Sequence, residues 1–521
     1  MQLTLQLKLL PSEAASDSIV REYAARAAAC PATDISGYQL LKRSIDARGK
    51  QPHMVLTLRA FIREPFLARP SIHINFSDVS RSDNQAIIIG AGPAGLFAAL
   101  KLIEKGVRPI LLERGKDVRS RRRDLALLNK EGILNPESNY CFGEGGAGTY
   151  SDGKLYTRSN KRGDIHRILN LLVQFGAEPD ILYDAHPHIG TNKLPQIIQA
   201  MRQQITDCGG IFLFEKKVVD LVLQDDRIKK VVTGDGESFE AGSVILATGH
   251  SARDIFFLLH DKKIRIEAKP FALGVRIEHP QSLIDSLQYH CSTRGEHLPP
   301  ASYSLVEQVG EKGVFSFCMC PGGIIAPAST AAGELVVNGW SPSKRNNPYA
   351  NSGMVVSVEE KDWTAFRQHG PLAALYFQQS VEQKAFEQGG GGFVAPAQRM
   401  TDFVNGLNSP SLPSCSYIPG LHSTSLRDVL PSFIYESLRQ GFTAFGKKLK
   451  GYYTNEAVVV ATESRTSSPV RIPRDPQTLQ HPQIKNLYPC GEGAGYAGGI
   501  VSAAMDGERV ADSIVALAAT H

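Results

Sequence analysis

Residues 85–95 read QAIIIGAGPAG, an isoleucine-rich apolar run that ends in three glycines with G-x-G-x-x-G spacing. The run predicts a short buried strand over Gln85–Ile89, and the pattern after Pro93 predicts a helix that reaches Lys105. A second apolar run, Val107–Leu112, completes a strand–helix–strand unit of about 30 residues. This order predicts a parallel sheet with the glycine turn at the carboxyl end of its first strand.

The three glycines of this turn serve different purposes. Gly90 permits the tight turn, Gly92 lets the backbone approach a pyrophosphate, and Gly95 allows the helix to pack closely on the strand. The amino end of the helix offers free N–H groups and a partial positive charge. Glu113, directly after the second strand, is placed to accept a hydrogen bond from a ribose 2′-hydroxyl. The sequence therefore predicts a bound dinucleotide.

Two more glycine-rich segments favour FAD over NAD as that dinucleotide. The segment FGEGGAGTYSDGKL, residues 142–155, is too polar for a core element and too rich in glycine for a stable helix. The segment YPCGEGAGYAGGI, residues 488–500, predicts a strand that leads into a final helix over Gly498–Ala518. The Glu492 carboxylate can hold ribityl hydroxyls, and the amino end of that helix can stabilise negative charge on a reduced flavin.

The residues expected to bind FAD come from these segments and from strand ends nearby. They are Gly90, Gly92, Pro93, Ala94, Gly95, Glu113, Arg114, Gly145, Gly146, Ala147, Lys154, Val218, Ala247, Thr248, Gly249, Gly491, Glu492, Gly498, Gly499 and Ile500. No second G-x-G-x-x-G follows another strand, so a dedicated NAD(P)H domain is not expected, although NAD(P)H stays open as an electron donor.

The rest of the chain predicts two further structural units. Residues 1–76 follow the order strand, helix, strand, strand, which predicts a small α+β module. Two later runs, Ser243–Ala247 and Asn486–Pro489, predict further strands of the parallel sheet. The region between about Ile264 and Asn455 predicts a mainly antiparallel sheet with added helices. Its expected strands are Phe271–Ile277, Val314–Met319, Glu334–Val337 and Met354–Val358.

Composition limits the class of protein. The 521 residues are 42% hydrophobic, which is typical of a globular chain of several domains. The net charge of +5 is too small to predict nucleic-acid binding, and the basic run 119–123 is predicted as a solvated helix face, with a phosphate contact as the alternative. The chain has eight cysteines without a CxxC pair, which favours the cytoplasm. It has no long apolar run and no signal-like start, so no membrane contact is expected. His186 and His188 lack a third ligand, so no metal is expected.

Five longer blocks carry a resemblance to a known family. They are KRSIDAR at 42–48, FGEGGAGTYSDGKL at 142–155, CMCPGG at 318–323, ESRTSSPVRIPRD at 463–475 and GEGAGYAGGI at 491–500. With these blocks the chain resembles the glutathione-reductase-like two-dinucleotide-binding-domain flavoproteins, and more closely a bacterial, mostly uncharacterised family of FAD-dependent dehydrogenases.

The resemblance implies a noncovalent FAD held by Gly90, Gly92, Gly95 and Glu113, and it implies a fold class and a division into domains. The fold is α/β, with a Rossmann-like FAD-binding domain, an inserted mainly antiparallel α+β substrate domain and a small amino-terminal α+β module. The FAD-binding domain would comprise residues 84–261 and 456–521, and residues 262–455 would form the substrate side. The loop at Gly145 and Gly146, together with Glu492, would lie nearer the isoalloxazine end.

The candidate catalytic residues lie in the glycine-rich or family-like blocks and not on periodic core faces. They are Lys154, Arg276, Cys318 and Cys320, with Arg465 and Ser467 as further candidates. On a regular strand Cys318 and Cys320 would share one face. They could form a redox pair, one could attack as a thiolate, or both could be small buried apolar residues.

These features lead to one main hypothesis and two alternatives. The main hypothesis is an FAD-dependent dehydrogenase or reductase that exchanges hydride with a small organic substrate. The first alternative is a flavin monooxygenase or oxidase. The second is a non-catalytic FAD-binding protein in which residues 1–76 dock a partner. The sequence does not predict an oligomeric state.

Overall fold

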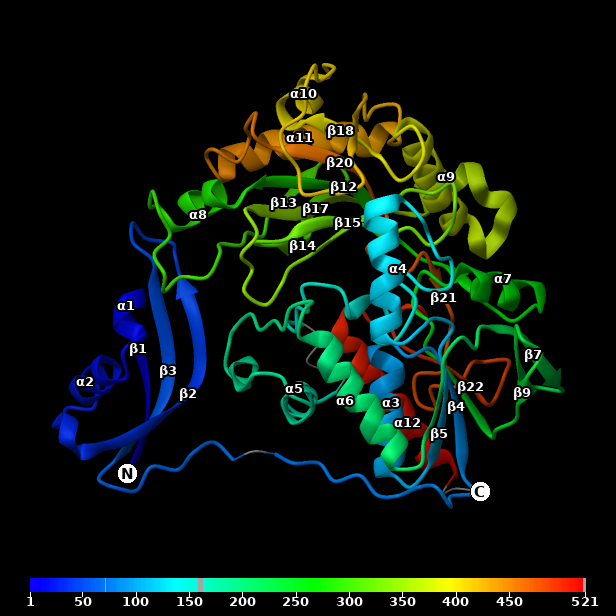
Figure 1. The fold of residues 1–521 in the computed structure, drawn as a ribbon, viewed down its shortest axis with the longest axis horizontal. Coiled ribbons are helices and arrows are strands. Elements are labelled where there is room, and N and C mark those ends of the chain that lie inside the picture. Colours follow the sequence, from blue (N-terminus) through cyan, green and yellow to red (C-terminus); the bar gives the residue numbers. More distant parts are fainter. Residues whose placement is uncertain (71, 158–162, 519–521) are drawn as a thin grey trace.

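A five-stranded sheet organises the part of the chain that carries the glycine turn (Figure 1), in a computed structural model that describes residues 1–70, 72–157 and 163–518. The strand order is β22-β10-β4-β5-β6, and every neighbouring pair is parallel. The strands are β4 (Gln85–Ile89), β5 (Arg108–Leu112), β6 (Ile211–Leu213), β10 (Ser243–Leu246) and β22 (Leu487–Pro489). The four apolar runs predicted as strands of one parallel sheet are confirmed. Sequence periodicity did not indicate β6.

The continuous apolar character of β4 reflects burial on both faces of this sheet. Ile88 packs in the core beneath one layer of helices, whereas Ile87 and Ile89 belong to the core on the opposite face. The first layer consists of α3 (Pro93–Glu104), α5 (Ile165–Gln174), α6 (Leu194–Asp207) and α12 (Ile500–Ala518). The opposite face carries β7 (Val218–Gln224), β8 (Arg227–Thr233), β9 (Ser238–Phe239) and α7 (Arg253–Asp261). The fold class is therefore α/β and Rossmann-like, as predicted.

A second, seven-stranded sheet lies above the first in the view of Figure 1. Its order is β13-β14-β17-β12-β20-β18-β19, antiparallel except for the β18–β19 pair. The strands are β12 (Phe271–Pro280), β13 (Val306–Val309), β14 (Lys312–Cys320), β17 (Tyr349–Val358), β18 (Ala395–Arg399), β19 (Leu421–Ser423) and β20 (Val458–Glu463). The helices of this region are α8 (Gln281–Tyr289), α9 (Ala373–Gln388), α10 (Met400–Asn405) and α11 (Ser432–Lys448). The predicted mainly antiparallel character is confirmed.

Two details of this region differ from the sequence expectation. The predicted strand Glu334–Val337 is wrong: β16 begins only at Val337, ends at Trp340, and pairs with β15 (Ile324–Pro327) in a separate two-stranded sheet. Glu334 instead forms an ion pair with Arg253 on α7. In addition, β20 lies in the seven-stranded sheet between β12 and β18, although residues from 456 onward were expected on the FAD side. Its four buried residues Val458–Ala461 fill the core of that sheet.

The amino-terminal residues form a separate three-stranded antiparallel sheet at the left of Figure 1. Its elements are β1 (Gln2–Leu9), α1 (Pro11–Ala14), α2 (Asp17–Ala27), β2 (Ile35–Asp46) and β3 (His53–Ile62), in the predicted order of strand, helix, strand, strand. Arg43 on β2 exchanges backbone hydrogen bonds with Tyr183 and Ala185 at 2.8 and 2.9 Å. The small sheet is thereby joined to the segment that follows α5.

The remaining α-helix is α4 (Val118–Glu131), and the remaining strands are β11 (Glu267–Ala268) and β21 (Val470–Arg471), which pair with each other. The described part of the chain also has the 3-10 helices η1 (Ala32–Asp34), η2 (Gly146–Gly148), η3 (Pro179–Leu182) and η4 (Glu360–Leu372). In the described ranges no helix is both long and apolar enough to cross a membrane. The expected division of the chain into three domains stays a prediction, and its last three residues, 519–521, lie outside the described part.

Candidate active site

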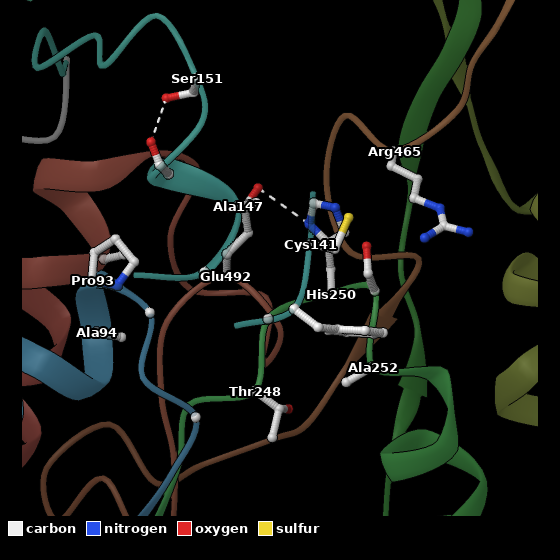
Figure 2. Close-up of a pocket in the computed structure, with 18 of the residues that line it drawn as sticks. Pro93, Ala94, Cys141, Ala147, Ser151, Thr248, His250, Ala252, Arg465 and Glu492 are labelled. Atoms are coloured by element: carbon white, nitrogen blue, oxygen red, sulfur yellow. Dashed lines mark hydrogen bonds and ion pairs between the residues drawn. The ribbon is translucent and has the colours of Figure 1, made fainter. Parts of the chain in front are cut away.

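A cavity of about 410 Å³ lies at the carboxyl ends of the parallel strands. One part of its wall is the glycine turn after β4, and the opposite part comes from the seven-stranded sheet, including Phe317 and Cys318 of β14 and Glu463 of β20. One continuous space therefore joins the predicted dinucleotide turn to the predicted catalytic residues. Figure 2 shows the turn at Pro93 and Ala94 on one side of the cavity and Arg465 on the other.

The geometry of the glycine turn requires glycine at two positions. Gly90 has a φ of +105°, and a Cβ there would lie 2.5 Å from the carbonyl oxygen of Ala247 on the adjacent strand end. A Cβ on Gly95 would lie 2.0 Å from the carbonyl oxygen of Gly90. A Cβ on Gly92 would meet only the Cα of Gly146, at 4.0 Å, so this side of the backbone stays open to a ligand. Gly92 precedes the first turn of α3 without a side-chain cap, which leaves the amino end of the helix to an anion.

Glu113 holds the neighbouring loops in place. Its carboxylate oxygens accept hydrogen bonds from the backbone N–H groups of Ala91, Gly115 and Gly143 at 2.8 to 2.9 Å. A carboxylate has about four acceptor positions, so three amides leave one for a hydroxyl group. Glu113 also lines the cavity, which keeps the predicted contact with a ribose available.

Arg121 fixes the glycine-rich loop that was predicted to lie against the cofactor. Its side chain is fully buried and donates hydrogen bonds to the carbonyl oxygens of Asn139, Tyr140 and Glu144 at 2.8 to 2.9 Å. The interpretation of the basic run 119–123 as a solvated face is therefore wrong for Arg121. The loop needs a donor for several inward carbonyl groups, and a guanidinium supplies five N–H groups in a fixed plane.

The second glycine-rich segment brings Glu492 to the cavity, where it meets His250. The Glu492 Oε1 atom lies 3.3 Å from His250 Nδ1, the contact drawn as a dashed line in Figure 2. Thr248 and Gly249 precede His250 at the end of β10 and also line the cavity. No sequence pattern indicated His250, because a single histidine after a strand has no distinguishing pattern.

Lys154 lies at the junction of the glycine-rich loop and the seven-stranded sheet. Its Nζ atom is 3.0 Å from Asp152 Oδ2, 3.9 Å from Cys318 Sγ and 3.7 Å from Cys320 Sγ. Asp152 is almost completely buried and is also paired with Arg345 at 2.6 Å. Burial alone would raise the pKa of Asp152, but Lys154 and Arg345 outweigh it and hold that pKa well below its usual range. This pocket wall therefore keeps its charges at neutral pH.

The two thiols differ in acidity because each influences the other. A hydrogen bond from Cys320 lowers the pKa of Cys318, burial opposes this, and Lys154 and Arg276 lower it further, to about 6. The same hydrogen bond and burial raise the pKa of Cys320 well above its ordinary value. These influences favour the first negative charge of the pair on Cys318, which lines the cavity.

Arg276 lies behind the cavity wall and does not line the cavity. It is fully buried, and it donates from Nε to Glu463 Oε2 and from Nη1 to Asn351 Oδ1, each at 2.7 Å. Glu463 itself lines the cavity. Burial raises the pKa of Glu463, and the neighbouring Arg276 only partly offsets the rise. Arg276 therefore positions Glu463, and Glu463 is the group of this pair that a ligand would meet.

Most of the predicted site residues line the one cavity. Those on its wall are Gly90, Gly92, Pro93, Ala94, Glu113, Arg114, Gly146, Ala147, Lys154, Val218, Ala247, Thr248, Gly249, Cys318, Arg465, Glu492, Gly498, Gly499 and Ile500. Gly95, Gly145, Arg276, Cys320, Ser467 and Gly491 are not among its lining residues. Lining residues that the sequence did not single out include Cys141, Asp152, Lys216, His250, Asn338, Glu463 and Thr466.

His186 and His188, for which no metal was expected, each contact another residue of the chain. His188 Nε2 is 3.1 Å from the carbonyl oxygen of Ser343, and His186 packs against Tyr156. Among the residues that the structure describes, no group of three or more histidine, cysteine, aspartate or glutamate side chains is placed to hold a metal ion.

The residues of the cavity fit FAD. Any Cβ at Gly90 or Gly95 would fill the space of the turn. The uncapped amino end of α3 suits a pyrophosphate. Glu113 and Glu492 offer carboxylate acceptors for hydroxyl groups. The amino end of α12 at Ile500 lies on the same wall and favours negative charge there.

Comparison with known proteins gives matches over most of the chain. A model described as "FAD-dependent protein, C-terminal domain-like" matches residues 270–466, and one described as "Pyridine nucleotide-disulphide oxidoreductase" matches residues 84–257. A domain of unknown function matches residues 1–61. An uncharacterized protein of Clostridium beijerinckii is 39% identical over 503 residues, which covers 92% of this chain and 93% of that protein.

Other similarities are partial or distant. The tRNA uridine 5-carboxymethylaminomethyl modification enzyme MnmG of Alkaliphilus metalliredigens is 30% identical over 171 residues, 31% of this chain and 23% of that enzyme. Among solved structures, tetracycline destructase Tet(51) has a TM-score of 0.34 at 14% identity and covers 83% of this chain and 82% of its own. Halogenase PltM has a TM-score of 0.38 at 12% identity, with coverages of 84% and 70%.

Fold and site together define a flavoprotein of the oxidoreductase class, with FAD as its cofactor. The chain belongs to the bacterial family of FAD-dependent oxidoreductases represented by the clostridial protein.

Proposed function

We propose that the protein is an FAD-dependent dehydrogenase or reductase that exchanges hydride with a small organic substrate in the cavity between the two sheets. The observation that carries this proposal is the continuity of that cavity from the glycine turn at Gly90 to Lys154, Cys318 and Glu463. FAD supplies two-electron transfer when bound. The chain's own task is then to bind, to orient and to hold protons.

Three residues of the substrate side support such a task. Glu463 is the candidate proton-holding group, because burial raises the pKa of its carboxyl group. Lys154 places a positive charge at the cavity wall, and Asn338 offers an amide group for a hydrogen bond. A substrate with a polar, reducible or oxidisable group suits this surface better than a purely apolar one.

The similarity to MnmG does not extend the proposal to tRNA. It spans less than a quarter of that enzyme, and the net charge of +5 over 521 residues gives no excess that favours nucleic acid. A small molecule is therefore the proposed partner, and the cytoplasm the proposed location.

The test is reduction of the flavin by defined donors. The purified protein is mixed without oxygen with NADH, NADPH and a panel of metabolites, and the loss of the oxidised flavin band is followed. We expect one donor to bleach the band on the time scale of turnover, and readmission of air then separates a dehydrogenase from an oxidase by the rate of recovery. FAD that no donor bleaches contradicts the proposal and favours the non-catalytic alternative.

A matched pair of variants makes the test specific for the site. Glu463→Gln removes the proton-holding group but keeps the shape, and we expect the rate of bleaching to fall at least tenfold, as is typical for a general acid or base. Glu456→Gln, a change outside the cavity wall in the same region of the chain, should leave the rate unchanged. Equal rates in both variants would remove Glu463 from the proposal.

A further inference from the structure

Strand β14 is irregular at the point where it carries two cysteines. Phe317 pairs with Gly353 and Cys320 with Asn351, and the register shifts between them. Cys318 lies in this bulge with a φ of +49°, in the left-handed region that favours glycine. A non-glycine residue there costs roughly 1–2 kcal/mol, so the surrounding structure holds Cys318 in a conformation that its own backbone does not prefer.

The bulge changes the relation between the two sulfur atoms. On a regular strand, two side chains that are two residues apart lie on the same face, and their Cα atoms are about 6.6 Å apart. This separation is near the upper limit for a disulfide. Here both sulfurs converge on one nitrogen, Lys154 Nζ, at 3.9 and 3.7 Å, and the Cys320 thiol donates a hydrogen bond to the backbone carbonyl oxygen of Cys318 at 3.3 Å. The strained residue therefore belongs to an arrangement that brings two thiols together.

The two cysteines have unequal access to the cavity. Cys318 is only partly buried and lines it, whereas Cys320 is completely enclosed behind it. One sulfur can thus meet a ligand, and the other can reach only its neighbour. This is the arrangement of an attacking thiol with a resolving thiol.

We propose that Cys318 and Cys320 are a redox-active dithiol that exchanges two electrons with FAD and passes them to or from a small thiol or disulfide substrate. This inference rests on the proposed function and names its substrate class. It places the centre on the seven-stranded sheet, far in the sequence from the first helix of the FAD-binding part.

The step balances in atoms and electrons. The reduced pair consists of the Cys318 thiolate and the Cys320 thiol. When the S–S bond forms, the S–H bond of Cys320 breaks, and the pair releases two electrons and one proton, which together reduce the oxidised FAD to its singly protonated anion. In the opposite direction the reduced flavin would return two electrons and one proton to the Cys318–Cys320 disulfide, which restores the thiolate and the thiol. The Cys318 thiolate then attacks a substrate disulfide, one substrate thiolate leaves, and Cys320 displaces the second substrate sulfur from the mixed disulfide and gives up its proton to it.

The surroundings support a thiolate at this position. The charged groups that face it are Lys154 beside Asp152, Arg276 on β12 and Glu463 on β20, and the cysteines belong to β14. Arg345, which pairs with Asp152, is a third cation, so the cations outnumber the two carboxylates by one and the thiolate balances that charge next to the half-buried ammonium group of Lys154. Cations next to a cysteine favour its thiolate form, which is the nucleophile.

Electron counting tests the proposal on the full-length, FAD-loaded protein. After mild oxidation and removal of oxygen, the protein is titrated with dithionite and the flavin band is followed. We expect the wild type to take up about four electrons per FAD and Cys318→Ser or Cys320→Ser about two, because FAD and a disulfide are each two-electron couples. Cys30→Ser, in the amino-terminal part, is the matched control and should keep the value of about four.

Peptide mapping and a substrate assay complete the test. Digestion of the oxidised wild type should show the Cys318–Cys320 disulfide, and the reduced protein should be reoxidised without oxygen by hydroxyethyl disulfide or cystine, at least tenfold faster than Cys318→Ser. Uptake of two electrons by the wild type, with both cysteines open to alkylation after oxidation, overturns the dithiol. Failure of the disulfides to reoxidise a four-electron protein overturns the substrate class. Bleaching by the donor panel is scored separately, so the proposed function can survive either result.

Discussion

Arg276 donates a hydrogen bond from Nε to Glu463 Oε2 across 2.7 Å, and the seven-stranded sheet encloses both side chains almost completely. The two residues face each other from β12 and β20, neighbouring strands of that sheet. Each charge is stable in this place only because of the other, since an isolated ion in a protein interior loses its hydration without replacement. The pair therefore couples the packing of the sheet to the cavity that Glu463 lines.

Replacing Arg276 with methionine should destabilise the protein strongly. The change leaves Glu463 buried without its cation, which typically costs about 3–5 kcal/mol. We also expect the pKa of Glu463 to rise further, because its nearest positive charge is lost. Urea unfolding followed by circular dichroism measures the free-energy difference.

Two other variants decide whether the loss comes from the broken pair. Arg276→Met combined with Glu463→Leu should recover most of the loss, because two apolar residues replace a buried ion pair at little cost. Arg48→Gln removes the exposed pair with Asp46 and should change stability by less than about 1 kcal/mol. A loss below that value for Arg276→Met would contradict the description of the pair.

Gly90→Ala should reduce FAD affinity more than any comparable change at a free surface. The new Cβ would lie 2.5 Å from the Ala247 carbonyl oxygen in a backbone with φ +105°, so the turn must shift. A shift that removes one hydrogen bond to the charged pyrophosphate, worth about 1.5–3 kcal/mol, weakens binding about tenfold or more. Flavin fluorescence during dialysis against free FAD measures the change. Gly242→Ala has open space around its Cβ and should bind FAD as the wild type does.

The part of the fold that could be predicted from sequence is the part where local pattern and global structure agree. The run Gln85–Ile89, the glycine turn and Val107–Leu112 each have one physical solution, a buried strand, a tight turn and another buried strand. The antiparallel region was harder, because short apolar runs do not say which sheet they join. Strand β20 thus lies in the seven-stranded sheet, although its sequence neighbours contribute to the FAD side.

The candidate site shows the same limit. Glycine spacing identified the turn at Gly90, but the three amides that bind Glu113 come from loops whose meeting cannot be read from spacing. Arg121 looked like one of several surface arginines, since its burial follows from a loop some 20 residues away. The regular strand assumed for Cys318 was wrong in detail, because a bulge leaves no mark in side-chain alternation.

The reactivity of Cys318 should depend on pH in a defined direction. Its pKa is lowered to about 6, first by the hydrogen bond from Cys320 and then by Lys154 and Arg276. Above that pH the sulfur is a thiolate and reacts with iodoacetamide, and below it the rate should fall about tenfold per pH unit as the sulfur becomes protonated. Mass spectrometry of the peptide that contains Cys318 measures the rate from pH 5 to 9.

Lys154→Met tests the cause of that acidity. Loss of the ammonium group should raise the pKa of Cys318, so that alkylation at pH 7 slows while the rate at pH 9 changes less. Asp152 keeps its second partner, Arg345, in this variant. Lys193→Met removes a surface lysine paired with Glu178 and should leave the profile of Cys318 unchanged. A profile for Lys154→Met that coincides with the wild type would show that Lys154 does not act on the thiol.

Arg43→Ala should loosen the attachment of the amino-terminal sheet without removing FAD. The Arg43 guanidinium donates to Asp184 at 2.6 and 3.0 Å and to Asp180 at 2.8 Å, and these partly exposed pairs are worth about 1 kcal/mol in total. Docking weaker by that amount opens the attachment about fivefold more often. The backbone N–H groups of Arg43 and Ala185 donate hydrogen bonds across the attachment, so their hydrogen–deuterium exchange should accelerate accordingly. Mass spectrometry of the exchanged peptides measures the rate, and the visible spectrum shows that FAD is retained. Arg48→Ala breaks a pair inside the same sheet and should exchange like the wild type. Equal exchange in all three proteins would mean that the backbone hydrogen bonds of Arg43 to Tyr183 and Ala185, which the variant keeps, hold the sheet in place by themselves.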